Sequence, residues 1–211
     1  MRKKHTNWHV LKEFDLSFKK QFIAGVDEAG RGPLAGPVVS SAVILDYNID
    51  INGLNDSKKL NPNERLNLFI KIINVSIDWS ISIVNNDIID NINILNATFL
   101  AMKKAIEKLK IKPDFVLVDG NRKIKNLPLE QKTIVKGDSK SAAIAAASIL
   151  AKVSRDFIMD YYHTLYPVYL FNKHKGYPTK KHISLIKNNG PSPIHRMSFH
   201  PLSTIFNKGL F

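Results

Sequence analysis

The stretch Phe22-Ile-Ala-Gly-Val-Asp-Glu-Ala-Gly-Arg-Gly-Pro-Leu-Ala-Gly-Pro-Val-Val-Ser-Ser-Ala-Val-Ile-Leu45 contains two apolar runs on either side of a segment rich in Gly and Pro. The first run ends in the acidic pair Asp27-Glu28, and the second extends from Val38 to Leu45. Short apolar runs bounded by Gly and Pro are typical of buried strands, and a short connection of this composition is typical of a hairpin. We therefore expect two paired strands with an acidic pair at the end of the first.

Beyond these two runs, hydrophobic periodicity indicates further helices and strands. Helices are expected from Pro62 onward, over 93–110, from Ser139 to about His163 and near 178–188, and strands over 77–84, 115–118 and 133–135. Strands first, then helix and strand in alternation, are typical of an α/β domain. After Tyr166 the signals are mostly those of loops, which indicates a small basic appendage to this domain.

The composition limits the class of protein. The chain has 211 residues, of which 44% are hydrophobic and 23% charged, and these values fit one globular domain with a small appendage. It has no cysteine, which excludes disulfides, thiolate catalysis and cysteine-bound zinc and suits a reducing cytosol. No apolar stretch approaches the roughly 20 residues that cross a bilayer, and no signal-peptide core follows the basic start. We expect a cytoplasmic protein with no membrane partner and, since no dimerisation stripe is evident, a monomer.

Positive charge accumulates toward the C-terminus. The net charge is +13, and no Asp or Glu follows Asp160. A surface of one sign concentrates polyanions, of which nucleic-acid phosphates are the commonest in a cytosol. The chain is also rich in Ile, Asn and Lys, a bias that AT-rich coding produces without any role in binding. The charge distribution favours a nucleic-acid partner over this neutral explanation.

Acidic residues follow three of the expected apolar strands or their immediate flanks. They are Asp27 with Glu28, Asp119, and Asp138. The carboxyl ends of strands in an α/β sheet meet at one edge, where sites form. Clustered carboxylates repel one another unless a cation neutralises them, and an all-oxygen set favours Mg²⁺ or Mn²⁺ over zinc. The pattern predicts a two-ion site for phosphodiester hydrolysis, in which one ion activates water and the other stabilises the leaving oxygen.

Each of these acids also has a structural explanation. Asp119 precedes Gly120, and this dipeptide is a common turn. Asp138 lies where the N-cap of the next helix is expected. Asp27 and Glu28 are compatible with an exposed strand end. The repeated order of apolar strand, acid and Gly is more specific than any single one of these residues.

Other residues near the acids are candidates for substrate contacts. Gly30, Arg31 and Gly32 let the backbone approach a ligand and present its N–H groups, although they also suit a tight strand connection. Tyr177 lies in the basic stretch His174-Lys-Gly-Tyr-Pro178, where it can stack on a sugar or base or pack the appendage. The lysines that fit phosphate contacts, each equally well explained as solvated surface, are Lys58, Lys59, Lys136 and Lys140.

Several blocks of the chain resemble bacterial ribonuclease HII, a type 2 ribonuclease H. In the family's order, the blocks are Gly25-Val-Asp-Glu-Ala-Gly-Arg-Gly-Pro-Leu-Ala-Gly36, Leu54-Asn-Asp-Ser-Lys-Lys-Leu60, Val118-Asp-Gly-Asn-Arg122, Val135-Lys-Gly-Asp-Ser139, Ala146-Ala-Ser-Ile-Leu-Ala-Lys-Val-Ser-Arg-Asp156 and His174-Lys-Gly-Tyr-Pro178. They extend from about residue 22 to residue 199, nearly the whole chain. The first and fifth blocks are long enough to be highly specific together.

The resemblance implies a ribonuclease H-like fold, in which helices flank a central mixed sheet and a small helical extension follows. The expected catalytic domain covers residues 21–165, and the basic extension packed on it covers 166–211. Residues 1–20, expected as a loosely ordered basic arm or a short helix, lie outside the resemblance and are assigned no function. The implied activity is hydrolysis of the RNA strand of RNA–DNA hybrids, including single ribonucleotides in duplex DNA. The implied mechanism uses two metal ions, Mn²⁺ or Mg²⁺, and leaves 5′-phosphate and 3′-hydroxyl ends.

The motifs also imply roles for individual residues. Asp27, Glu28 and Asp119 match the family's metal-binding acids, and Asp138 matches the fourth acid of the active site. Asp156 is a further candidate, although pairing with another residue of the long helix, such as Arg155, is favoured for it. The residues expected to contact substrate are Gly30, Arg31, Gly32, Lys58, Lys136, Ser139, Lys140 and Tyr177, among which Gly30–Gly32 and Tyr177 match the elements that read the ribose 2′-hydroxyl.

Two other functions are compatible with parts of the sequence. A basic nucleic-acid-binding module without catalysis accounts for the charge and for Tyr177. It does not account for acids after short strands, which repel phosphate unless a cation lies between. A nuclease or integrase of the same fold that acts on DNA accounts for the acids. The 2′-hydroxyl-reading elements, which a DNA-cutting enzyme does not need, distinguish ribonuclease H from it.

Overall fold

The sheet at the centre of the molecule has five strands in the order β3-β2-β1-β4-β5. The computed structural model describes residues 8–54 and 60–206. The strands are β1 Ile23–Ala29, β2 Val38–Leu45, β3 Ser76–Val84, β4 Phe115–Asp119 and β5 Gln131–Ile134. β1, β2 and β3 pair antiparallel, whereas β4 is parallel to β1 and β5 is parallel to β4. This mixed sheet confirms the α/β architecture expected from the sequence.

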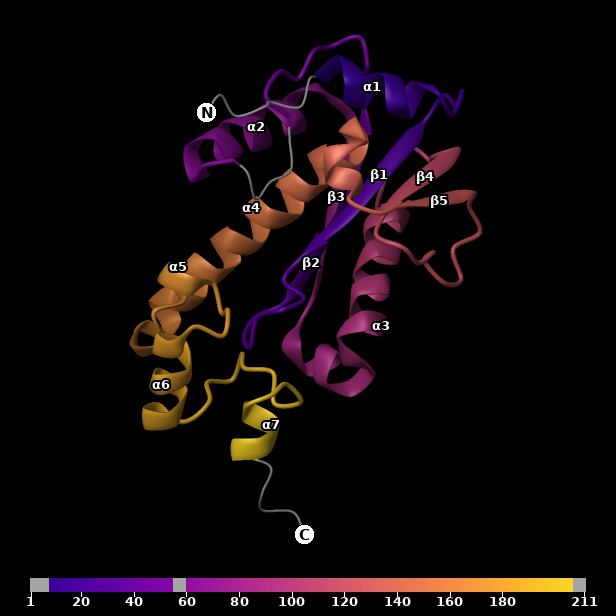
Figure 1. Cartoon of the computed structure of the whole chain (residues 1–211). Coiled ribbons are helices and arrows are strands. Elements are labelled where there is room, and N and C mark those ends of the chain that lie inside the picture. The colour runs from indigo at the N-terminus through magenta and orange to yellow at the C-terminus, as the bar shows by residue number, and fades with distance from the viewer. Residues whose placement is uncertain (1–7, 55–59, 207–211) are drawn as a thin grey trace.

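β1 and β2 form the hairpin that their apolar runs predict, and both strands are almost wholly buried. Helix α4, Ala142–Leu165, covers one face of this part of the sheet, and α3, Asn86–Glu107, covers the other (Figure 1). A strand covered on both faces needs apolar residues at nearly every position. The two-sided covering therefore explains why the runs are continuous instead of alternating.

α4 approaches β1 very closely because small residues line the contact. All residues of 142–147 are Ala or Ile and all are buried. A Cβ on Gly25 would lie 2.1 Å from the backbone carbon of Ala143, so only glycine fits there. The helix begins after Ser141, whose Oγ accepts the N–H of Ile144 at 3.1 Å. The N-cap is thus Ser141 and not Asp138.

Asparagine side chains mark the starts of two helical segments. α2, Pro62–Val75, begins where its first proline predicts, and Asn61 caps it. Inside α3, Asn93 has a φ of 64°, and its Oδ1 accepts the N–H of Asn96 at 3.1 Å. The helix therefore restarts at Asn93, which explains why the hydrophobic periodicity places its beginning there.

The described part of the expected N-terminal arm is a helix that belongs to the core. α1, Trp8–Leu16, buries the indole of Trp8, whose Nε1 donates to Asp50 Oδ1 at 2.7 Å. The carboxylate of Asp15, also buried, accepts the N–H of Ala143 at 2.9 Å. This bond links α1 to the first turn of α4. Of the two alternatives considered for this segment, a short helix is the one observed from Trp8 onward.

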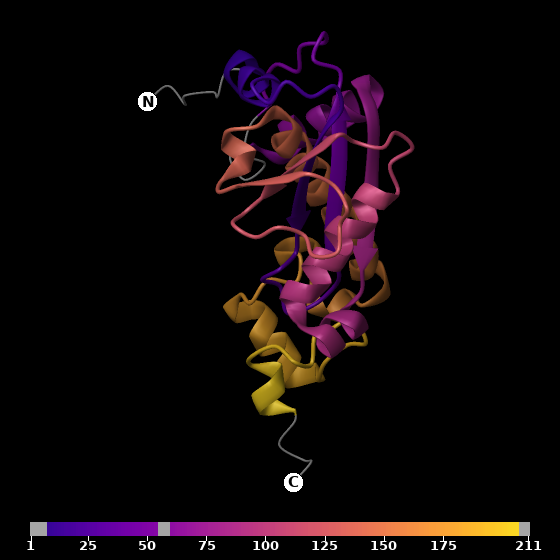
Figure 2. The ribbon, with the colours of Figure 1, turned by 90° about the vertical axis from the view of Figure 1, so that its right-hand side faces the viewer.

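The residues after α4 form short helices at the end of the sheet opposite α1 (Figure 2). They are η2 Pro167–Tyr169, α5 Phe171–His174, α6 Lys180–Asn189 and α7 Leu202–Ile205. Leu34 and Ala35, from the β1–β2 connection, share a buried cluster with Phe171, Ile186 and Leu202 of these helices. The C-terminal segment therefore packs on that connection. Within the two described ranges, no helix is both long and apolar enough to cross a bilayer.

Substitution Asp15→Asn is expected to remove a pH-dependent loss of stability. Burial raises the pKa of Asp15 from 3.8 to about 6, so the folded chain keeps a proton that the unfolded chain has lost. The stability that this proton contributes is complete below about pH 4 and is lost as the pH rises through about 6. Relative to wild type, the variant should gain up to about 3 kcal/mol between pH 4 and 7. Urea unfolding across this range measures the difference, and parallel pH profiles would contradict the expectation.

Candidate active site

Two parallel strands bring acidic residues together at one edge of the sheet. Asp27 and Glu28 lie in the second half of β1, and Asp119 is the last residue of β4. The pairing of Val26 with Val118 places the three acids on neighbouring strands. All three line one pocket.

The carboxylate of Asp27 is nearly inaccessible, with the residue only 5% exposed. Its Oδ1 accepts the N–H of Glu28 at 2.7 Å, and the hydroxyl of Ser148 also hydrogen-bonds to it. Burial, followed by the charges of Glu28 and Asp119, raises the pKa of Asp27 well above its ordinary value. Negative charge is therefore in excess at this point, and a cation would relieve it.

Asp138 lies in the 3-10 turn η1, Gly137–Ser139, which adjoins the end of β4. The N–H of Gly137 donates to Asp119 Oδ1 at 2.7 Å, which ties this turn to the end of β4. Asp138 is buried, but it is not among the residues that line the pocket. Because Ser141 caps α4, helix capping does not explain the acid at this position.

The residues of the pocket fit a divalent cation that prefers oxygen ligands. Asp27, Glu28 and Asp119 offer carboxylate oxygens only, and their repulsion falls when a cation lies between them. Across residues 8–54 and 60–206, no three acidic or histidine side chains are already arranged around one point as ligands. Asp27 and Asp119 instead each turn one oxygen to a backbone N–H. The pocket thus has the charge and the donor type for an ion without a preformed cage.

The connection between β1 and β2 is held from inside the protein by Arg196, which is fully buried. Its guanidinium donates to the carbonyl oxygens of Gly30, Arg31 and Gly36 at 2.6, 3.1 and 2.9 Å. Gly30 has a φ of +100°, and a Cβ on it would lie 2.1 Å from Arg155 Nε. Glycine is therefore required at this position both for its conformation and for the space it leaves.

A second buried arginine, Arg155 of α4, holds the rest of the connection. It donates to the carbonyl oxygens of Ala35, Pro37 and Lys175 at 3.1, 3.0 and 2.9 Å. Burial lowers the pKa of Arg155 to about 10 and that of Arg196 to about 9. Both guanidinium groups lie among carbonyl oxygens, whose partial negative charges offset the loss of hydration.

Tyr177 lines the same pocket as the acids, together with Gly30, Arg31 and Gly32. Its residue is 42% exposed, and its Cε1 would lie 3.6 Å from a Cβ placed on Gly32. The guanidinium carbon of Arg155 lies 5.9 Å from the centre of its ring. Residues 27–32, Asp119 and Tyr177, which are far apart in the sequence, therefore line one pocket.

Four other residues expected to contact substrate are Lys58, Lys136, Ser139 and Lys140. Lys136 and Lys140 flank η1 and are exposed, and Ser139, the last residue of η1, is half-buried. None of these three residues lines the pocket. Lys58 lies outside the described residues.

The partners of Asp156 differ from the expectation that it pairs with Arg155. Lys152 Nζ lies 2.6 Å from one carboxylate oxygen of Asp156, and Arg65 Nη1 lies 3.5 Å from the other. Arg155 points instead toward the β1–β2 connection, where carbonyl oxygens accept all of its bonds named above. Asp156 thus pairs within the long helix, as expected, but with Lys152 instead of Arg155, and also with Arg65 of α2.

Part of the positive charge of the C-terminal segment is internal. Arg196 is buried, and Lys175 pairs with Asp160. In the part of this segment that the structure describes, the exposed lysines are Lys173, Lys180, Lys181 and Lys187. The basic surface available to a polyanion is therefore smaller than the sequence indicates.

The helices that border the acids contribute pocket residues that the motif analysis missed. Ser148 and Lys152, one turn apart on α4, line the pocket of Asp27. An adjoining pocket shares Glu28, Arg31 and Asp119 and is otherwise lined by Leu95, Thr98, Phe99, Met102, Gly120, Asn121 and Arg122. Two polar residues at i and i+4 in an Ala-rich buried helix are a signal that could have identified the first pair.

Over most of its length the chain is similar to ribonuclease HII. A model of the ribonuclease HII family matches residues 24–202. The ribonuclease HII of Endomicrobium trichonymphae is 57% identical over 198 residues, which cover 92% of this chain and 94% of the relative. That of Caldicellulosiruptor saccharolyticus is 58% identical over 193 residues, with the same shares covered, 92% and 94%.

Solved structures of related enzymes have the same fold. The crystal structure of the ribonuclease H2 from Pyrococcus horikoshii OT3 matches with a TM-score of 0.72 and 29% identity, over 87% of this chain and 96% of that chain. The crystal structure of Bst-RNase HIII in complex with Mn²⁺ matches with a TM-score of 0.66 and 16% identity, over 87% and 68%. These matches confirm the ribonuclease H-like fold that the sequence implies.

Substitution Arg196→Met is expected to destabilise the protein by about 3–5 kcal/mol, because it leaves three carbonyl oxygens of the β1–β2 connection without their buried donor. The control is Lys187→Met on the exposed side of α6, for which a change within about 0.5 kcal/mol is expected. Urea unfolding at neutral pH measures both. A loss below about 1 kcal/mol for Arg196→Met would mean that other donors satisfy these carbonyls.

Proposed function

Because the chain belongs to the ribonuclease HII family, we propose that the pocket of Asp27, Glu28 and Asp119 is its active site. Membership of this family makes the protein a metal-dependent ribonuclease H, a hydrolase that cleaves RNA paired with DNA. One observation supports this assignment of the site. The three acids line one pocket with Gly30–Gly32 and Tyr177.

We propose that Asp27, Glu28, Asp119 and Asp138 would hold the divalent ions. The raised pKa of Asp27 supports this role, because burial and then the charges of Glu28 and Asp119 disfavour its carboxylate, which a bound cation would stabilise. Mn²⁺ or Mg²⁺ suits an all-oxygen set, and the similar Bst-RNase HIII was crystallised with Mn²⁺. When bound, two such ions supply an activated water and stabilise the leaving 3′-oxygen.

The loop of Gly30, Arg31 and Gly32 would read the 2′-hydroxyl of the ribonucleotide at the cleaved bond. The carbonyls of Gly30 and Arg31 are bonded to Arg196, while the loop lines the pocket, so its position relative to the acids is fixed. The exposed ring of Tyr177 beside Gly32 offers a face on which a sugar can stack. The 2′-hydroxyl is what distinguishes RNA from DNA at a single position. A loop that contacts one 2′-hydroxyl suits a single ribonucleotide within a DNA duplex as well as a longer hybrid.

The proposed reaction is hydrolysis on the 5′ side of the ribonucleotide, with 5′-phosphate and 3′-hydroxyl products. The protein contributes positioning and stabilisation of charge, and no covalent intermediate forms on a side chain. The monomeric state, the cytoplasmic location, and the division into residues 1–20, 21–165 and 166–211 stay predictions.

Specific cleavage at a lone ribonucleotide tests this function. In the presence of Mg²⁺ or Mn²⁺, a DNA duplex that contains one ribonucleotide should be nicked there, and excess EDTA should abolish the nick. End-labelled strands resolved on a denaturing gel report both the position and the end groups. An all-DNA duplex of the same sequence is the control. No nick at the ribonucleotide would contradict the proposal, and cleavage of the control would favour a DNA nuclease.

Substitution Asp27→Asn is expected to lower kcat by about a thousandfold or more, the scale of losing a group that stabilises the charge of the transition state. Affinity for the hybrid should stay within about threefold of wild type, because removal of a negative charge does not weaken phosphate binding. The control is Asp87→Asn on the exposed first turn of α3. Single-turnover cleavage and a binding titration separate the two effects. Near-normal turnover of Asp27→Asn would show that the metal-site assignment is wrong.

A further inference from the structure

Two buried histidines of the C-terminal segment have no part in the reaction proposed above. His182, on α6, and His195 are both within 1% of complete burial, and their Nε2 atoms lie 3.1 Å apart. His182 Nδ1 lies 2.9 Å from the carbonyl oxygen of Tyr177. His195 Nδ1 lies 2.8 Å from the backbone nitrogen of Ser192. These contacts form a continuous chain from Ser192 to Tyr177.

The protons along this chain have one consistent arrangement. A backbone N–H can only donate, so Nδ1 of His195 accepts from Ser192, and the ring proton of His195 is on Nε2. This Nε2–H donates to Nε2 of His182, whose own proton is then on Nδ1. The Nδ1–H of His182 donates in turn to the carbonyl of Tyr177. Both rings are neutral in this arrangement, and burial keeps them so by lowering their pKa values to about 4 for His182 and about 3 for His195.

His174 holds the other side of the turn that carries Tyr177. Its Nδ1 accepts the N–H of Gly176 at 3.2 Å, and its ring stacks on that of His182 with the centroids 4.2 Å apart. A Cβ on Gly176 would lie 2.6 Å from the carbonyl oxygen of Ala35, so the turn is in close contact with the β1–β2 connection. The backbone of this turn is therefore fixed from several directions.

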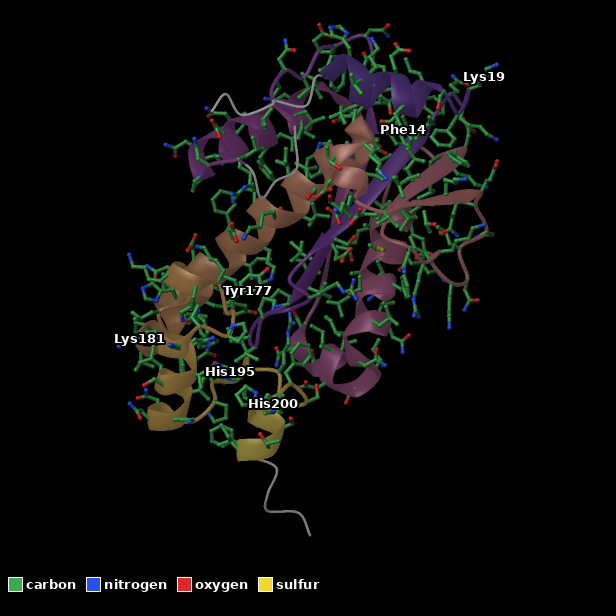
Figure 3. All side chains as sticks on the ribbon, in the orientation of Figure 1. Phe14, Lys19, Tyr177, Lys181, His195 and His200 are labelled. Carbon is green, nitrogen blue, oxygen red and sulfur yellow. The ribbon has the colours of Figure 1, made fainter. Side chains whose placement is uncertain are left out.

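The segment that begins the histidine chain also holds the loop of Gly30–Gly32. His195 forms an isolated β-bridge with Ala35, and the next residue, Arg196, donates to the carbonyl of Gly30. Tyr177 and His195 both lie where the C-terminal segment meets the β1–β2 connection (Figure 3). The segment His195-Arg196 thus holds the loop directly and contacts, through His182, the backbone of Tyr177.

We propose that His182 and His195 are positioning residues that set the ring of Tyr177 against the nucleotide bound at the loop of Gly30–Gly32. This rests on the proposed function, because it requires Tyr177 to touch the substrate. Neither histidine lines the pocket, so both act through the main chain. The bond to the Tyr177 carbonyl fixes the backbone from which the half-exposed ring projects. Rates of positioned reactions respond strongly to displacements of about 1 Å, which gives this anchor its importance.

Asn and Gln substitutions distinguish the two ends of each imidazole. The amide of Asn lies near the position of Nδ1, and that of Gln lies near Nε2. His182→Asn therefore keeps a donor for the Tyr177 carbonyl, whereas His182→Gln keeps only the contact with His195. At His195 it is Gln, and not Asn, that keeps the bond needed for the chain to Tyr177. His195→Gln keeps the donor to His182, whereas His195→Asn keeps only the acceptor for Ser192.

The substrate for the test is a DNA duplex with one ribonucleotide. His182→Gln should lower kcat about tenfold and change KM less than about twofold, because the ring is displaced while the wider basic surface still binds the duplex. His182→Asn should recover most of this loss, and His195→Asn should cost more than His195→Gln. Equal losses for Asn and Gln at both positions would overturn the proposal, because packing alone does not produce a crossed pattern.

A double-mutant cycle with Tyr177→Ala tests whether the histidines act through the tyrosine. In the Tyr177→Ala background, His182→Gln should change kcat less than about twofold, since the ring to be positioned is absent. The full loss in both backgrounds would overturn the proposal. Thermal unfolding checks that each variant is folded. If His182→Gln is unfolded, His195→Asn and His195→Gln are compared in the same way.

The same measurements separate this proposal from the function on which it rests. If Tyr177→Ala cleaves at the wild-type rate, Tyr177 has no role at the substrate, and both its assignment and the histidine chain fail. If Tyr177→Ala is slow but His182→Gln is not, only the histidine proposal fails, and the assignment of the pocket stands.

Discussion

The connection between β1 and β2 depends on two buried guanidinium groups for its shape. Arg155 and Arg196 each donate to three carbonyl oxygens, and five of these six oxygens belong to residues 30–37. A buried Arg without a carboxylate partner is costly, but so is a buried turn whose carbonyls have no donor. Here the carbonyl oxygens supply the acceptors that the buried guanidinium groups need, and the guanidinium groups supply the donors that the carbonyls need. The loop is held on one side by these bonds, and its residues Gly30–Gly32 line the pocket of the acids.

This dependence makes the C-terminal segment part of the site and not an accessory to it. The sheet alone places Asp27 next to Asp119, since that requires only the parallel pairing of β1 with β4. The position of the Gly-Arg-Gly loop requires Arg196 as well, and Tyr177 comes from the same segment. A boundary near residue 166 describes the order of elements along the chain. It does not separate two independent structures, because buried contacts cross it.

Local patterns predicted the elements, and distant partners limited what could be predicted of the site. The hairpin, the start of α2 and the acids after short strands follow from apolar runs and capping residues that are adjacent in the sequence. The positive charge of the C-terminal segment was interpreted as surface charge, but Arg196 is buried, and a sequence does not show that its partners are carbonyls far upstream. Asp156 has the expected partner on the long helix, but that partner is Lys152, because the guanidinium of its sequence neighbour Arg155 points elsewhere. Ser148 was overlooked inside an Ala-rich helix whose small residues already had a packing explanation.

The parallel pairing of β1 with β4 has a consequence for the chain during its synthesis. The N-terminal part emerges first, and β1 can pair with β2 at once, whereas β4 and α4 follow much later. While the chain is incomplete, Asp27 lacks Asp119, and the loop beside it lacks Arg196 until almost the last residues have been made. A ribosome-bound fragment that already carries Asp27 and Glu28 therefore lacks both the third acid of the proposed site and the guanidinium that holds its loop. The order of translation thus completes the proposed site only after the C-terminal segment has been made.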